Sequence, residues 1–144
     1  MTFKLESKDK ILIRGDTKRY RFTLREKQVD PNVEPDRINL TGSRVVFTMK
    51  LTDPRGAVGF QNTATSVVKT SDDTSEIIVL DQGAVATKGQ ATIILVTGDT
   101  RFLPPGVYAY DVEVTTAQGS VITAACGRIL LRSKPTEAED LTTP

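Results

Sequence analysis

Three arginines near the start of the chain are spaced so that an extended strand would place them on one side. Arg19, Arg21 and Arg25 occupy odd positions, and residues two apart in a strand lie about 7 Å from each other on the same face. Guanidinium groups bind carboxylates and phosphates through paired hydrogen bonds. Because Tyr20 and Phe22 alternate to the opposite face, where they could not stack on bases, we predict an acidic protein partner and no nucleic acid. The alternative is a solvated or edge face without a partner.

Four carboxylates follow one another within ten residues in the middle of the chain. They are Asp72, Asp73, Glu76 and Asp81. Such oxygens can bind a hard cation, but the pattern of a calcium loop with its central glycine is not met. We therefore expect solvated loop carboxylates and no metal.

Other reactive side chains are scarce. The sequence has no His, which excludes an imidazole base, a Ser-His or Cys-His pair and a histidine metal ligand. Asp111 and Glu113 share a strand face, but glycosidase chemistry needs two carboxyl groups across a cleft. The single Cys126 cannot form an intrachain disulfide, and we expect a small core residue there. The predicted protein is thus not an enzyme, with no catalytic residue and no cofactor.

The elements that would position these residues are short strands. Thr, Val and Ile, which favour strands, make up 43 of the 144 residues. Apolar and polar residues alternate over 18–25 and 44–51, further strand candidates are 76–80, 90–96, 106–116 and 120–132, and 67–68 hints at another strand. Turn residues separate these runs, and one helical turn is expected near 97–103. The spacing predicts one domain over residues 10–132, an all-β antiparallel sandwich of about seven or eight strands.

The alternation also predicts which side chains form the core. The expected core residues are Tyr20, Phe22, Leu24, Val45, Phe47, Met49, Ile93, Leu95, Tyr108, Tyr110, Val112, Val114 and Ile129. Phe60 and Phe102 are the aromatic residues expected in loops. We also expect the hydroxyls of the two tyrosines in 106–116 to reach backbone at the edge of the sandwich, as in a tyrosine corner.

Both ends of the sequence are polar. Residues 1–9 are predicted to be an N-terminal extension without the apolar run of a signal peptide or membrane span. Residues 133–144 are predicted to form a polar tail, in which Glu137, Glu139 and Asp140 meet basic residues of a neighbour and Leu141 is the apolar anchor. The formal net charge of +1 favours neither nucleic acid nor a membrane surface.

The order of several short motifs resembles a known family. The motifs are Gly15-Asp16-Thr17, Tyr20-Arg21-Phe22-Thr23, Asn39-Leu40-Thr41-Gly42-Ser43-Arg44-Val45-Val46-Phe47, Gly98-Asp99-Thr100, Leu103-Pro104-Pro105-Gly106-Val107-Tyr108, Gly119-Ser120 and Gly127-Arg128-Ile129. Over residues 10–132 they resemble the β-sandwich modules of tailed bacteriophages. The family in question is the N-terminal domain of baseplate upper proteins, together with related immunoglobulin-like domains of tail and head-fibre proteins.

This resemblance implies an immunoglobulin-like fold and a structural role. We expect an adaptor component of the virion, in the tail, baseplate or head-tail region, that is synthesised in the host cytoplasm and docks onto other virion proteins. A symmetric homo-oligomer or ring is expected, because phage assemblies repeat each component. The alternative is a carbohydrate-binding or adhesion module on the same scaffold, with a capsid-decoration or head-fibre role; the scarcity of loop aromatics argues against it.

Overall fold

Turn residues divide the chain into short strands, as the alternation predicts. The computed structural model describes residues 3–4, 6–7, 10–26, 30–33, 36–52 and 65–133. Its elements are β1 (Phe3–Lys4), β2 (Glu6–Ser7), β3 (Lys10–Ile13), β4 (Lys18–Thr23), β5 (Arg25–Glu26), β6 (Arg44–Leu51), β7 (Thr65–Thr70), β8 (Ile77–Val79), β9 (Gln90–Leu95), α1 (Thr97–Thr100), β10 (Gly106–Thr115) and β11 (Val121–Arg132). No helix among these described elements is long and apolar enough to cross a membrane.

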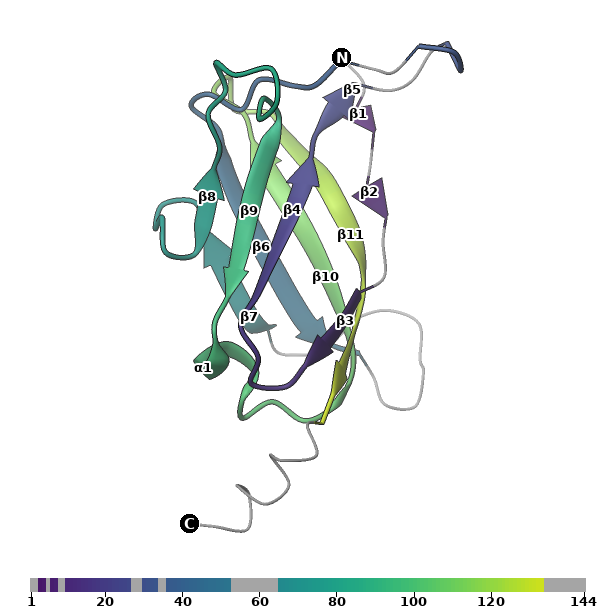
Figure 1. Ribbon diagram of the computed structural model, residues 1–144, viewed down its shortest axis with the longest axis vertical. Helices are drawn as coiled ribbons and strands as arrows, with labels where there is room; N and C mark the ends of the chain where they lie inside the picture. The colour runs from purple at the N-terminus through teal and green to yellow at the C-terminus, as the bar shows by residue number, and fades with distance from the viewer. Residues whose placement is uncertain are drawn as a thin grey trace.

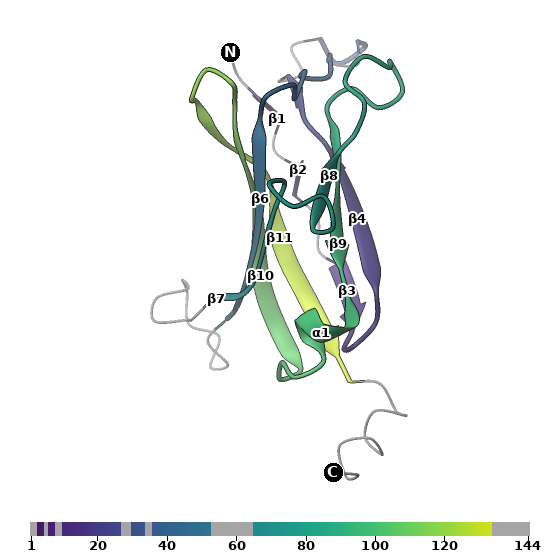
Figure 2. The same ribbon diagram turned by 90° about the vertical axis from the view of Figure 1, so that its left-hand side faces the viewer.

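The strands form two facing sheets. One sheet has the order β4-β9-β8, and the other has the order β2-β11-β10-β6-β7 with β3 also paired to β11. Figure 1 shows the smaller sheet in front of the larger one, and Figure 2 shows the two layers from the side. The pairs are antiparallel except for β2 and β3, which run parallel to β11. The architecture is therefore an all-β sandwich.

The strand order is that of an immunoglobulin-like domain. With β1–β3 taken as one interrupted strand and β4–β5 as another, the described strands number eight. In immunoglobulin lettering the small sheet is B-E-D and the large sheet is A′-G-F-C-C′. The interrupted first strand serves both sheets, because β1 pairs with β5 while β2 and β3 pair with β11. The immunoglobulin-like sandwich expected from the sequence is confirmed.

The core lies between the two sheets. Every core residue that the strand alternation predicts is buried in one apolar cluster. Further members of this cluster are Leu12, Leu40, Val67, Ile77, Ala91, Ala124, Ala125 and Leu131. Phe47 and Tyr110 stack across β6 and β10 with ring centroids 5.9 Å apart. The period-two pattern therefore predicted the inward faces of the main strands correctly.

The connection from β9 to β10 is fixed by three polar contacts. The hydroxyl of Tyr108 donates a 2.6 Å hydrogen bond to the carbonyl of Pro104, four residues upstream. This is the predicted tyrosine corner. Asp99 accepts a 2.7 Å bond from the N–H of Val96 at the start of α1 and forms a 2.7 Å ion pair with the buried Lys69 of β7. The helical turn is thereby tied to the opposite sheet.

Two features of the strands differ from the sequence prediction. Residues 3–4, 6–7 and 10–13 form strands that were not expected, so the predicted N-terminal extension is hydrogen-bonded to the sandwich through β1 and β2. Cys126 is only half-buried and lies outside the core cluster, contrary to the prediction. The reason is a bulge in β11, where Ala124 is inserted between the partners of Val112 and Glu113. Ala124 and Ala125 both point inward, and Cys126 moves to the outer side.

Candidate functional site

Two of the three predicted arginines lie together on the outer side of the small sheet. Arg19 and Arg21 of β4 are exposed, and Tyr20 and Phe22, which alternate with them, are buried. We call Arg19 and Arg21 the basic face. Arg25 is half-buried in β5, and its backbone pairs with β1. It therefore does not belong to the part of the β4–β5 edge that lacks a neighbouring described strand.

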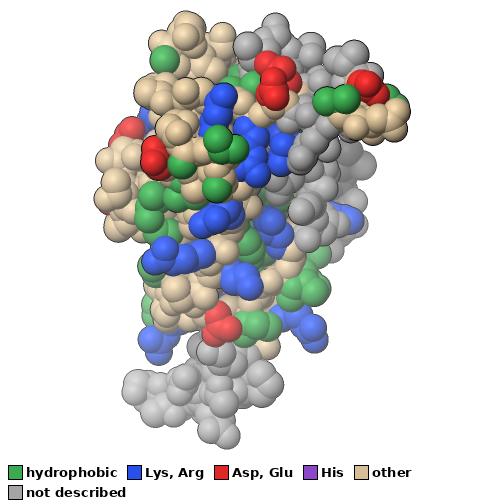
Figure 3. Space-filling model, turned by 45° about the horizontal axis from the view of Figure 1, so that its top comes forward, with side chains coloured by type: hydrophobic (Ala, Val, Ile, Leu, Met, Phe, Trp, Pro, Cys, Tyr) green, Lys and Arg blue, Asp and Glu red, His purple; other side chains and the backbone are tan. Residues whose placement is uncertain are grey.

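The basic face has no partner within the described part of the chain. Neither Arg19 nor Arg21 makes a side-chain hydrogen bond, ion pair or ring contact with any described residue. Figure 3 shows several Lys and Arg side chains gathered on this side of the molecule, with few acidic ones among them. Two guanidinium groups in water beside each other are available to a carboxylate-bearing partner.

The basic face covers a buried hydroxyl. The register places Arg19 opposite Ile94 and Arg21 opposite Thr92 of β9. Both β9 residues are only 7% exposed although they point away from the core, since the residues between them belong to the core cluster. The Oγ1 atom of Thr92 has no hydrogen-bond partner among the described residues. The aliphatic parts of the two arginine side chains therefore lie over a sheet surface that has little contact with solvent.

The backbone of the basic face lies at an open sheet edge. The N–H of Leu24 donates to the carbonyl of Gly89, which continues the register of β4 and β9. In an antiparallel pair such bonds alternate, so the even positions of β4 bond to β9. The N–H and C=O groups of Arg19, Arg21 and Thr23 point the other way. No other described strand pairs with β4, because β1 reaches only Arg25 and the residue after it.

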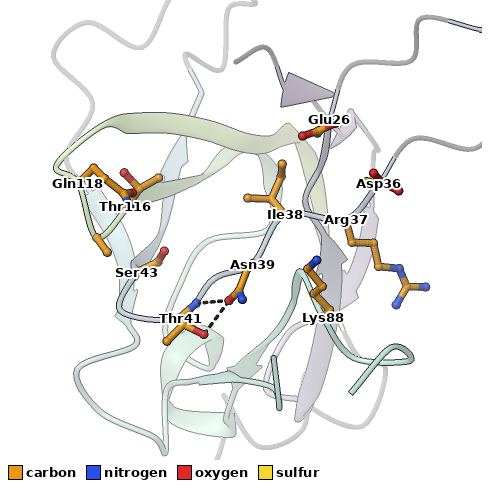
Figure 4. A pocket seen from close by; sticks show the side chains of 11 residues that line it. Glu26, Asp36, Arg37, Ile38, Asn39, Thr41, Ser43, Lys88, Thr116 and Gln118 are labelled. Carbon is orange, nitrogen blue, oxygen red and sulfur yellow. Dashed lines mark hydrogen bonds between the residues drawn. The ribbon is translucent and has the colours of Figure 1, made fainter. Parts of the chain in front are cut away.

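An open cavity of about 510 Å³ lies at one end of the sandwich. Figure 4 shows its lining, which comes from β5, the segment before β6, the turn between β8 and β9 and the hairpin turn between β10 and β11. The lining residues are Glu26, Asp36, Arg37, Ile38, Asn39, Thr41, Ser43, Lys88, Thr116, Ala117 and Gln118. Nine of these eleven side chains carry hydroxyl, amide or charged groups, which can bind a polar ligand. Sequence reasoning missed this cavity, because its four segments are far apart in the chain.

One glutamine fixes two of the cavity segments to each other. Oε1 of Gln82 accepts 2.8 Å hydrogen bonds from the N–H groups of Leu40 and Gly89, and its Nε2 donates to the carbonyl of Leu80. Gly89 has φ +78°, and a Cβ at this position would lie 2.9 Å from the carbonyl oxygen of Leu24. The close approach of the turn to the rest of the cavity therefore requires glycine.

The cations that line the cavity differ in their contacts. One guanidinium nitrogen of Arg37 donates to the carbonyls of Val85 and Ala86 at 3.3 and 2.7 Å. Figure 4 shows this side chain extending away from Gln118, on the side opposite the hairpin turn. Lys88 has no side-chain partner among the described residues. Of the two, Lys88 is the cation that can serve a ligand without losing a structural contact.

The acidic cluster considered for a cation is used in local contacts instead. Its members are Asp72, Asp73, Glu76 and Asp81. Asp72 pairs with Arg44 at 2.9 Å, and Asp73 accepts bonds from the hydroxyl and N–H of Ser75, which hold the pKa of that carboxyl below its usual value. Glu76 and Asp81 each accept a backbone N–H bond within their own turn. Within the described ranges, no three acidic or cysteine side chains converge as metal ligands.

The second acidic pair lies on the outer side of the large sheet. Asp111 and Glu113 of β10 are both exposed. Partial burial, with the nearby Glu113 charge as a smaller cause, raises the pKa of Asp111, and Lys50 opposes the shift. Two carboxylates on one open sheet face have no wall across from them, so the geometry does not match that of a glycosidase.

The remaining predicted contact residues fall in two groups. Phe102 follows α1 and is 82% exposed, with the guanidinium of Arg101 5.6 Å from its ring centroid. α1 lies at the end of the sandwich opposite the cavity (Figure 1), and Phe102 follows it closely in the chain. Phe60 and the tail residues Glu137, Glu139, Asp140 and Leu141 lie outside the described residues.

Comparison with known proteins adds little to this description. No family model matches the sequence, and no curated protein matches it. Among solved structures, a structure of murine CRIg is similar, with 14% identity and a TM-score of 0.35 over 88% of this chain and 92% of that chain. A likeness this weak carries no argument, so the immunoglobulin-like assignment rests on the strand order and pairing given above.

Proposed function

We propose that this protein is a structural adaptor of a tailed-bacteriophage particle, which docks onto neighbouring virion proteins through the basic face. The observation that carries the proposal is the pair of exposed arginines, Arg19 and Arg21, which have no described partner and lie at an open sheet edge. The phage setting comes from the resemblance of residues 10–132 to baseplate upper protein N-terminal domains and related tail and head-fibre modules. Because the sandwich has a buried apolar core between its two sheets, it can present this face rigidly to a partner.

The proposal extends to location and assembly. The protein is made in the host bacterial cytoplasm and resides in the virion, in the tail, baseplate or head-tail region. It works as a symmetric homo-oligomer or ring, because repetition lets contacts of modest affinity hold an assembly together. Glu137, Glu139, Asp140 and Leu141 provide a second contact with a neighbour.

A structural role also agrees with how the carboxylates are used. The acidic residues of the 72–81 region stabilise turns, and Asp99 stabilises the connection between the sheets. These contacts give the carboxylates of this region and Asp99 structural tasks, which supports the proposal of a non-enzymatic component without a cofactor.

Incorporation into particles tests the proposal. Replacing Arg19, Arg21 and Arg25 by Ser, or deleting residues 133–144, should each lower the number of copies per particle severalfold, whereas Lys88→Ser and Arg101→Ser should not. Circular dichroism of each purified variant checks that the sandwich is retained. Normal incorporation of both test variants would exclude these contacts, and absence of the wild-type chain from purified particles would exclude the proposed role.

The polar cavity favours a second candidate function, a carbohydrate-binding or adhesion module with a capsid-decoration or head-fibre role. Its amide and hydroxyl groups are of the kind that bind sugar hydroxyls. A glycan array tests this candidate. Binding that is lost on Asn39→Ala and Gln118→Ala would support it, and loss on Phe60→Ala and Phe102→Ala would place the sugar at other loops. No binding to any glycan would exclude it.

A further inference from the structure

The geometry points to a specific partner for the basic face: the acidic segment 136–141 of a second copy of this chain, added as a strand to the open edge of β4. The inference rests on the proposed function, since it identifies one of the partners of the same face. Three observations carry it: a backbone edge of β4 and two arginines that have no partner among the described residues, and an acidic segment with the matching period.

The open edge supplies backbone hydrogen bonds. Arg19, Arg21 and Thr23 direct their N–H and C=O groups away from β9, and no other described strand pairs with them. An extended segment that lies along this edge can form a ladder of backbone hydrogen bonds with β4. β1 forms such an antiparallel ladder with β5, which follows β4 in the chain. Such an edge otherwise invites unspecific pairing, and a charged partner makes the pairing selective.

The charged residues of the basic face and of the acidic segment have the same spacing in sequence. Arg19 and Arg21 are two residues apart and point outward, so their Cα atoms are about 7 Å apart. Glu137 and Glu139 are also two residues apart. In an antiparallel alignment that sets Glu139 beside Arg19, Glu137 lies beside Arg21, and both guanidinium groups gain a carboxylate.

The inner side of the edge selects a small residue. Between the sheets next to β4 lies a narrow space of about 10 Å³, lined by Lys10, Tyr20 and Tyr110 among others, with Nζ of Lys10 4.8 Å from the Tyr20 ring centroid. This space admits no large side chain. In the added strand the residue between the two glutamates is Ala138, whose methyl group needs almost no room.

A second copy fits this edge better than the chain's own end. The carbonyl of Arg132 accepts the N–H of Arg14, where β3 ends beside β11, and residues 14–17 then lead into β4. The chain's own segment would have to pass round this turn and run parallel to β4 (Figure 1). A segment from another copy can run antiparallel, which is the more stable pairing. This contact is head-to-tail, so repeated use closes a ring or extends a filament.

Charge reversal in the full-length protein tests the inference. Sedimentation velocity at several concentrations compares the wild type with Arg19→Glu plus Arg21→Glu, with Glu137→Arg plus Glu139→Arg, and with all four changes together. Arg101→Glu plus Arg132→Glu is the matched control, because it changes the net charge by the same amount as the first variant and both side chains are exposed and lie outside the basic face and the cavity. Hydrogen exchange measured by NMR reports on the amides of Arg19, Arg21 and Thr23.

We expect the wild type to self-associate, more strongly at low salt, and the three edge amides to exchange more slowly as concentration rises. Each double reversal should raise the dissociation constant about tenfold or more, and the fourfold variant should restore it to within about threefold. The control should stay within about twofold of the wild type.

Three results would overturn the inference. They are a wild type that stays monomeric at every concentration, an association that neither reversal weakens or that the fourfold variant does not restore, and edge amides that are protected in a monomer, which would assign the edge to the chain's own segment. These outcomes are separable from failure of the proposed function. A chain that incorporates into particles without self-association contradicts only this inference, and a self-associating chain absent from particles contradicts only the proposed function.

Discussion

The hydroxyls of Tyr108 and Tyr20 are predicted to respond in opposite ways to removal. Tyr108 is fully buried, and its hydroxyl donates a 2.6 Å bond to the Pro104 carbonyl. Tyr108→Phe removes that bond and leaves the carbonyl without its donor, which should cost about 1–2 kcal/mol of unfolding free energy. For a domain of this size, the melting temperature should fall by roughly 3–8 °C.

Tyr20→Phe is the matched control. The hydroxyl of Tyr20 is buried and has no hydrogen-bond partner among the described residues. Removing it relieves a desolvated polar atom, so the change should be neutral or stabilising by up to about 1 kcal/mol. Urea denaturation of both variants at pH 7 provides the free energies. Equal losses for the two variants, or a larger loss for Tyr20→Phe, would refute the hydrogen-bond assignment.

An alkaline titration tests the burial of the Tyr20 hydroxyl through its pKa. Burial raises the pKa of Tyr20 to about 12 from the ordinary 10.0. The folded state therefore keeps this proton in a range where the unfolded chain releases it, so stability should fall as the pH rises from 10 towards 12. Tyrosinate absorbance should show Tyr20 ionising late, and the late component should be missing in Tyr20→Phe. Ionisation of Tyr20 near pH 10 in the folded protein would contradict the burial argument.

Three further substitutions test the packing and charges around the proposed surfaces. Lys69→Met leaves Asp99 without its buried partner and should cost about 2–4 kcal/mol in urea denaturation; a loss below about 0.5 kcal/mol would contradict the structural role of this pair. Gly89→Ala forces a left-handed φ on alanine and a contact with a backbone carbonyl, so it should cost about 2 kcal/mol or more, and a neutral result would disprove the close approach. Asp111→Asn should raise the melting temperature at pH 7, because the folded state disfavours this carboxylate, and the gain should vanish below pH 3.8, where Asp111 is protonated in both states. An equal gain at both pH values would rule out charge as the cause.

The sequence alone was sufficient for the inward faces of the long strands. Phe47 and Met49 alternate with Thr48 and Lys50, with Val46 the exception in the strand, and only one register puts both in the core. The tyrosine corner was also predictable, because Tyr108 follows a Pro-rich corner that brings its hydroxyl back to the chain. Both features depend on residues that are close together in the sequence, so they can be predicted without knowledge of the rest of the fold.

Features that depend on distant partners could not be predicted in this way. β3 has no alternating pattern, and its parallel pairing with β11 depends on a strand more than a hundred residues later. The bulge at Ala124 shifted Cys126 outward, because one inserted residue changes the face of those that follow. The cavity depends on Gln82 joining Leu40 to Gly89, a contact that no spacing in the sequence indicates. For the basic face, the exposure of Arg19 and Arg21 was predicted, but the partial burial of Arg25 was not.

The most direct test of the central claim is electron microscopy of intact phage particles at a resolution that traces the chain. We expect several symmetry-related copies of this sandwich, each with Arg19 and Arg21 of β4 against carboxylates of a neighbouring protein. A particle that lacks the chain, or one in which every copy leaves the basic face in solvent and docks through another surface, would contradict this claim.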